Sequence, residues 1–452
     1  MLFFSFHHSV RRSLLLLFLY MTLFGVPHVV LNVPAGGWFW ATLGASFLFG
    51  MFVFFRGTTT LQFYYIFFVF ILMFGYFIQT LAGISYKIHT FTPSSFSLST
   101  FVFIVAHFAG MAIGASLRKR SRPNVIVRER LSPSYWLFGT ATFLFLFATF
   151  VAFFGTEPLF APRNELFGTE LSGTVRALAG MLKAFPFVFM AILFGRLRDG
   201  RFRRRDAVAL VVTFIAAIAF SNPITTPRYI SLGGILLVIA AWLGQTSKSR
   251  HLLVLTVLSA YVSVFLLPIT STLRTGLDQF DFAKVISMYS GLEFSSIHVL
   301  MDGINAGSQL PSGNVLITDF FSLVPPAIFP GSLRAAPVGP SIAESSGYVF
   351  SNAAVPSFFS AYLDGGAIGL IIFSILMGYV MQAASVAERS DMRNRRDGYA
   401  LILFACIPIL ARGDLRTAVV AFYDFAIAYE IFLFVVRLRF GKRANVASRR
   451  FL

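Results

Sequence analysis

Four arginines are the residues of the chain best suited to binding an anion. Arg228 ends the stretch SNPITTPR, Arg274 ends LPITSTLR, and ARGDLR holds both Arg412 and Arg416. Because each adjoins the end of a long apolar run, all four are expected at the same membrane interface. A guanidinium fork binds phosphate oxygens through two parallel hydrogen bonds. The set therefore predicts a phosphate or pyrophosphate site, and the sequence contains no glycine-rich nucleotide loop beside it.

Two further residues are candidate general bases. The pattern from Gln279 to about Ile304 predicts an amphipathic helix, on which Glu293 falls inside the apolar stripe. A desolvated carboxylate takes up a proton more readily, which suits a base; a break at Gly291 that turns Glu293 outward is the alternative. The polar face of the same helix is expected to carry His298, and a solvated histidine without a catalytic role is the other interpretation.

Charged residues also fall inside predicted membrane spans. Arg176 and Lys183 are seven residues apart and share one helix face. Lys183 and Asp424 lie about 14 Å and about 12 Å from the outer starts of their spans, at about 1.5 Å per residue. These depths predict a Lys183–Asp424 pair lining a polar cavity. For any one of these charges, snorkelling to the headgroups or a structural ion pair is an equally good interpretation.

The sequence offers little to hold a metal ion. No group of His, Asp or Glu has metal-ligand spacing, and Cys406 is the only cysteine. An intramolecular disulfide and a cysteine-based metal site are therefore excluded. We expect a site that works without a metal or other cofactor.

The elements that position these residues follow from the composition. The chain has 452 residues, of which 57% are hydrophobic and only 12% charged, with a mean hydropathy of +0.76. A soluble domain carries about twice that share of charge, so a soluble protein is excluded. We expect an all-α, polytopic membrane protein with about twelve transmembrane helices. The apolar runs are 13–33, 36–55, 61–82, 98–117, 135–156, 174–195, 207–221, 229–245, 252–270, 357–383, 399–411 and 416–436.

The basic residues predict the orientation of these spans. With an even number of spans, 27 of the 37 Lys and Arg residues fall on the side of the N-terminus. The positive-inside rule then makes both termini cytoplasmic. The net charge of +18 is therefore an orientation signal, and it gives no reason to expect nucleic acid as a partner.

One long segment interrupts the series of short connections. Residues 271–356 form a single outer segment, rich in Pro and Gly but also in Phe, Ile, Leu and Val, so we expect short helices inside it and not a disordered linker. Glu344, in PSIAESSGY, is a candidate polar contact there. The whole chain, 1–452, is expected to form one integral membrane domain around this segment.

Three short motifs resemble the bacterial O-antigen and capsule repeat-unit polymerases. They are PSFFSAYLDGGAIGLIIFSILMGYV at 356–380, ARGDLRTAVVAF at 411–422 and NPITTPR at 222–228. The many spans, the long outer segment late in the chain and the arginines at the outer interface are similar to that family as well.

The resemblance implies a function at the outer, periplasmic face of the bacterial inner membrane. Such polymerases transfer a growing glycan from undecaprenyl pyrophosphate to the end of a new lipid-linked repeat unit. The four arginines would hold the leaving pyrophosphate, and Glu293 or His298, with Asp414 as a weaker third candidate, would be the base. Lipid-linked oligosaccharides and the bilayer are the implied partners, and a chain-length regulator is a further candidate.

Two other functions remain open at this point. An O-antigen ligase-type glycosyltransferase has the same architecture and an outer-loop histidine, a role that His298 could fill. A flippase or transporter of lipid-linked oligosaccharide would use buried charges such as Arg176, Lys183, Asp424 and Glu430. The absence of repeated halves argues against the transporter.

Overall fold

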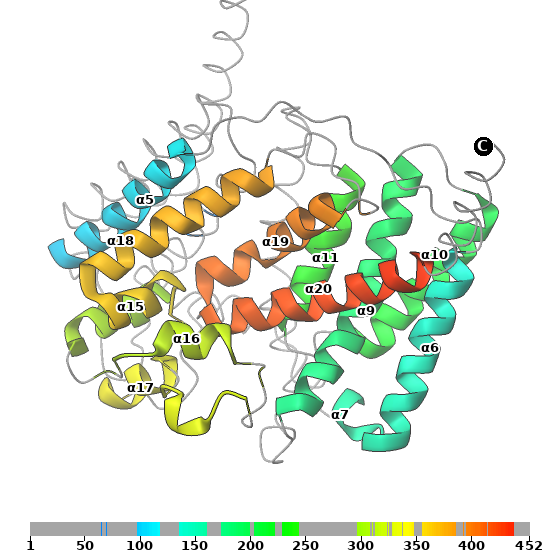
Figure 1. The fold of residues 1–452 in the computed structure, drawn as a ribbon, viewed down its shortest axis with the longest axis horizontal. Coiled ribbons are helices and arrows are strands. Elements are labelled where there is room, and N and C mark those ends of the chain that lie inside the picture. The colour runs from blue at the N-terminus through cyan, green and yellow to red at the C-terminus, as the bar shows by residue number, and fades with distance from the viewer. Residues whose placement is uncertain are drawn as a thin grey trace, which may run out of the picture. The chain divides into compact units, whose positions relative to one another are not determined.

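The described residues of the structure, a computed structural model, form helices joined by turns and irregular residues and include no strand, which confirms the expected all-α fold for that part of the chain (Figure 1). It describes residues 65, 69, 97–117, 135–160, 173–198, 203–221, 228–243, 296–307, 310, 312–322, 324, 328–336, 338–347, 355–385, 392, 395–413 and 415–437.

Eight of the twelve predicted spans coincide with helices of the structure. These are α5 (Leu98–Leu117), α6 (Tyr135–Phe154), α9 (Gly173–Arg198), α10 (Arg204–Ser221), α11 (Arg228–Leu243), α18 (Phe358–Ser385), α19 (Arg395–Arg412) and α20 (Leu415–Arg437). The runs 13–33, 36–55, 61–82 and 252–270 lie outside the described residues, apart from the helical Tyr65 and Val69.

Five helices are long and apolar enough to cross a membrane. Within α5, α6, α9, α18 and α20 the qualifying stretches are Leu98–Leu117, Tyr135–Phe154, Ala177–Leu197, Phe358–Ala384 and Leu415–Val435. The α11 helix holds a shorter apolar stretch, whereas α10 and α19 both begin with Arg-Arg-Asp and so have fewer apolar residues. The chain is therefore a helical membrane protein, and the count of twelve spans stays a prediction.

The chain divides into two compact units. Unit 1 comprises 1–122, 260–386 and 407–418, and unit 2 comprises 123–259, 387–406 and 419–452. Each is discontinuous in sequence, and α19 and α20 each contribute residues to both.

Unit 1 is organised around the seam between α5 and α18, which run side by side (Figure 1). A Cβ at Gly110 would lie 2.6 Å from Cβ of Ser374, and Cβ atoms at Gly114 and Gly378 would collide with the carbonyls of Ile375 and Met111. Small residues therefore let the two backbones touch, as is common between membrane helices.

The expected short helices of the long segment are present in unit 1. They are α15 (Ser296–Ala306), α16 (Val315–Phe320), a 3-10 turn (Gly331–Leu333) and α17 (Val338–Ser345). The α15 helix packs on α17 and α5, and α16 packs on α18. The described end of α15 lies within two residues of the predicted end, and the predicted start at Gln279 lies outside the described residues.

Unit 2 has α9 at its centre. Helices α6, α10, α11 and the four-residue α7 (Glu157–Phe160) all pack on α9, whose apolar stretch is 83% buried. By contrast, α6 and α10 expose many apolar side chains, which suits contact with lipid: Leu137, Leu144, Phe145, Phe153, Val208, Val211, Phe214, Ile215 and Ile218.

Candidate functional site

A layer of polar groups lies in the middle of unit 2, next to a proline in α9. Pro186 has no N–H to offer the preceding turn of the helix. The hydroxyl of Ser221, on α10, donates to the carbonyl of Lys183, and the hydroxyl of Ser231, on α11, donates to the carbonyl of Ser221 at 2.7 Å. Lys183 itself is 3% exposed, so its ammonium group belongs to this otherwise apolar interior.

Asp424 is the second charged residue of this layer. It is 1% exposed, and a Cβ at Gly180, on the α9 turn before Lys183, would lie 2.5 Å from its Oδ2. Glycine at 180 is thus what makes room for the carboxylate. The Oδ2 atom accepts no hydrogen bond from any described residue. The sequence correctly predicts that Lys183 and Asp424 are both buried in the bundle.

The predicted ion pair between Lys183 and Asp424 is not formed. No ion pair or side-chain hydrogen bond of either residue is found among the described parts of the chain. An unpaired charge in an apolar interior is costly and is a functional candidate by default. The two buried groups are therefore candidates for a functional polar site, since no described residue pairs with either side chain.

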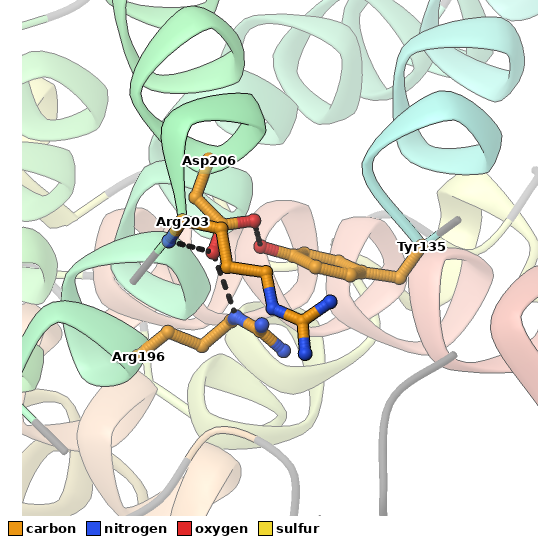
Figure 2. Close-up of polar contacts among 4 residues, drawn as sticks. All are labelled: Tyr135, Arg196, Arg203 and Asp206. Carbon is orange, nitrogen blue, oxygen red and sulfur yellow. Dashed lines mark hydrogen bonds and ion pairs between the residues drawn. The ribbon is translucent and has the colours of Figure 1, made fainter. Parts of the chain in front are cut away.

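A second buried carboxylate of unit 2, Asp206, has partners on both oxygens (Figure 2). Tyr135 donates its hydroxyl to Oδ1 at 2.9 Å, while the backbone N–H of Arg203 (2.9 Å) and Nε of Arg196 (3.3 Å) reach Oδ2. The Arg196 guanidinium also lies over the Tyr135 ring, 4.7 Å from its centroid. The cluster fastens the ends of α6, α9 and α10 together, which is a structural role.

Glu430 is likewise paired. Its carboxylate accepts from Nη2 of Arg395 at 2.6 Å and from the Tyr399 hydroxyl at 3.0 Å, which ties α20 to the start of α19. Because the Glu430 carboxylate is bound to these two partners, it gives no support to the interpretation of the protein as a transporter.

His298 does not lie on a solvated face, and the expected polar face is wrong at this residue. It is 3% exposed, as buried as Ile297 and Leu300 of the predicted apolar stripe, because α15 packs on both α5 and α17. Burial lowers the pKa of His298 to about 3, so the ring is neutral at pH 7. A neutral ring can accept a proton, but so low a pKa makes it a weak base while it stays buried.

The predicted phosphate-binding arginines occupy helix ends. Arg228 begins α11 in unit 2, Arg412 ends α19, and Arg416 lies in the first turn of α20, both of the latter in unit 1. The Arg416 side chain is half-buried, with no ion pair or hydrogen bond to the described residues. Arg274 lies outside the described residues, and the convergence of all four stays a prediction.

The other predicted site residues are placed as follows. Glu344 is exposed on α17, and Arg176 belongs to the first turn of α9. Glu293 and Asp414 lie outside the described residues. Within the described residues, no group of three His, Cys, Asp or Glu side chains is arranged to hold a metal ion, and Cys406 is a buried free thiol.

Two sets of polar contacts in unit 1 involve partners that the sequence pattern does not predict. The carboxylate of Asp364, on α18, accepts the backbone N–H groups of Val315 and Leu316 at 2.8 and 2.7 Å. The His107 ring, on α5, is hydrogen-bonded to Ser374 at 2.7 Å and to Tyr65 at 2.9 Å. The Asp-Gly-Gly sequence around Asp364 is a signal for a helix break that could have drawn attention to it.

Comparison with known proteins gives no match, whether with family models, curated proteins or solved structures.

Proposed function

We propose that the protein is a membrane glycosyltransferase that joins oligosaccharide repeat units carried on undecaprenyl pyrophosphate. The proposal places the reaction at the periplasmic face of the bacterial inner membrane, with both termini in the cytoplasm. Its first support is the resemblance of the motifs at 222–228, 356–380 and 411–422 to repeat-unit polymerases.

The observation that carries the proposal is that the Arg416 guanidinium forms no ion pair or hydrogen bond with a described residue. This half-buried guanidinium has no partner among the described residues and lies in the first turn of the 23-residue helix α20. A helix N-terminus is already positive, so a cation there is unfavourable unless an anion joins it. Arg412 precedes it by four residues across the tight turn between α19 and α20. Both features favour an anionic ligand, and a lipid pyrophosphate has the right chemistry.

The proposed reaction assigns a role to each group. An acceptor hydroxyl attacks the anomeric carbon of the donor glycan and gives its proton to a base. The bond from that carbon to the pyrophosphate breaks, and the arginines stabilise the charge on the leaving group. Among the candidate bases, the burial of His298 favours Glu293 or Asp414.

The test uses cells that lack the protein and carry a plasmid copy. Loss of a polymerase leaves a lipid core capped with one repeat unit, and loss of a ligase accumulates long lipid-linked polymer. Loss of a flippase leaves no repeat unit outside. We expect the first phenotype, and we expect Arg416→Ala, Arg412→Ala and Arg274→Ala to abolish long chains while the protein remains at normal abundance.

Two control variants sharpen this test. Arg204→Ala removes an exposed arginine from the start of α10 and should leave chain length unchanged. Arg416→Lys keeps the charge but loses the bidentate contact, so cells that carry this variant should also lack most of the long chains. Wild-type chain lengths in Arg416→Ala and Arg412→Ala would contradict the phosphate-binding role.

A transporter of lipid-linked oligosaccharide is the second candidate function. It is favoured by the buried Lys183 and Asp424, which form no ion pair with any described residue. In that case the cells would show no repeat unit outside, and Asp424→Asn would give the same defect as loss of the protein.

A further inference from the structure

The start of α16 is held by the helix α18. The backbone N–H groups of Val315 and Leu316 each donate to the carboxylate of Asp364, which is the seventh residue of α18. Asn314, which precedes α16, has a φ of 66° and gives no side-chain hydrogen bond to the helix. The cap therefore comes from α18 and not from the local sequence, so α16 shares the depth of Asp364.

The geometry of α18 sets that depth. The helix has 28 residues and a break at Gly366, where φ is 58° and ψ is −147°. At about 1.5 Å per residue, the part after Gly366 spans ~29 Å, which matches the ~30 Å hydrocarbon core of a bilayer. The residues before Gly366, Asp364 included, then lie in the headgroup region. The first turn of α16 lies there with them.

A cluster of exposed apolar side chains follows this anchor. We call it the interface patch, and it consists of Ile317, Phe320, Phe321, Ile328 and Leu333. Ile328 is 75% exposed. Between residues 317 and 333 the only charged side chain is Asp319, which is buried. Exposed clusters of this kind indicate a site of interaction.

Side-chain hydrogen bonds join the described residues around the interface patch to one another. The Arg334 guanidinium donates to the carbonyls of Val324 and Phe329 and lies 5.6 Å from the centroid of the Phe329 ring. The hydroxyl oxygen of Thr318, on α16, accepts the N–H of Ala335 at 2.8 Å. These contacts hold the described residues around Ile328 and Leu333, whose own side chains are exposed.

We propose that the interface patch inserts into the boundary between headgroups and acyl chains of the leaflet at the N-terminal end of α18. A lipid surface fits better than a protein partner because the patch is continuous with a membrane helix and has no exposed charge, whereas protein interfaces have a polar rim. On α17, by contrast, the exposed side chains at 344 and 345 are Glu and Ser, so that helix faces water. The inference is independent of the reaction proposed above.

Spin labels measure this directly. In a Cys406→Ala background, nitroxides are attached to Ile328→Cys and Leu333→Cys, with Glu344→Cys as the matched exposed control. The full chain is reconstituted in vesicles of phosphatidylethanolamine and phosphatidylglycerol, and collision with oxygen and with a water-soluble nickel chelate is compared. We expect an oxygen-to-nickel ratio several-fold higher at 328 and 333 than at 344.

Two results would overturn the inference. Ratios at 328 and 333 equal to that at 344 would mean that the patch faces water. Spin–spin broadening that disappears on dilution with unlabelled protein would mean that a second copy covers it. The two patch labels are independent, so either variant carries the test if the other does not fold.

Discussion

Two of the carboxylates buried in unit 2, those of Asp206 and Asp424, have opposite surroundings. Asp206 and Asp424 are 2% and 1% exposed. Asp206 has an arginine, a tyrosine hydroxyl and a backbone N–H within hydrogen-bonding distance. Asp424 packs against Gly180, and its Oδ2 has no hydrogen-bond partner among the described residues. Burial alone therefore does not separate structural from functional charges; the partners do. A carboxylate with partners on both oxygens fastens helices, whereas one without a partner among the described residues is a candidate for function.

The largest expected effect is that of Asp206→Asn. The change leaves Arg196 without its counter-charge, so we expect the free energy of unfolding to fall by about 3–5 kcal/mol. Unfolding by SDS titration of the purified protein measures it. The control is Arg205→Ala, an exposed neighbour on the same turn of α10; an equal and small loss in both variants would show that the cluster adds nothing to stability.

The same change at Asp424 is expected to act in the other direction. Asp424→Asn removes a buried charge that has no partner among the described residues, so the free energy of unfolding should rise by about 1–3 kcal/mol. If the residue is functional, long glycan chains should disappear from cells that carry this more stable variant. A destabilisation as large as that of Asp206→Asn would mean that Asp424 is paired in the working protein and would remove the contrast.

A smaller effect is expected at Glu430. Its pair with Arg395 is partly exposed, with side chains 30% and 55% accessible. Ion pairs of this kind contribute about 0.2–1 kcal/mol, so Glu430→Gln should lower the SDS midpoint only slightly. A loss comparable with that of Asp206→Asn would place Glu430 among the groups that hold the bundle together.

The smallest expected quantity is the coupling between Lys183 and Asp424. No ion pair joins the two residues. The effects of Lys183→Met and Asp424→Asn on the free energy of unfolding should therefore be additive within about 0.5 kcal/mol in a double-mutant cycle. A coupling clearly above that value would show that the two residues pair in a conformation other than this one.

Much of the helical layout could be predicted from the sequence, because long apolar runs have few alternatives in a bilayer. The α5 run, 98–117, has the predicted bounds, whereas α10 and α19 begin three and four residues earlier than predicted. Hydropathy does not register their polar first turns, where Asp206 and Asp397 lie close to the positive helix start.

The site was less predictable, because spacing along a helix gives depth but not partners. The predicted depth correctly puts Lys183 and Asp424 in the interior, yet it cannot show that the Asp424 carboxylate packs against the backbone at Gly180. The burial of His298 was missed because a two-faced pattern assumes one buried side, and α15 has neighbours on two sides. The partners of Asp206 and Asp364 come from other helices, which no local pattern reveals.

The seam between α5 and α18 has a consequence for how the protein is made. His107 and Ser374, which it joins, are 267 residues apart in the chain. A ribosome that synthesises from the N-terminus delivers α5 to the membrane long before α18 exists. Until then the glycine-lined side of α5, with its histidine, has no Ser374 to bond to. The seam between α5 and α18 therefore closes late in synthesis, whereas the contact of His107 with Tyr65 can form earlier.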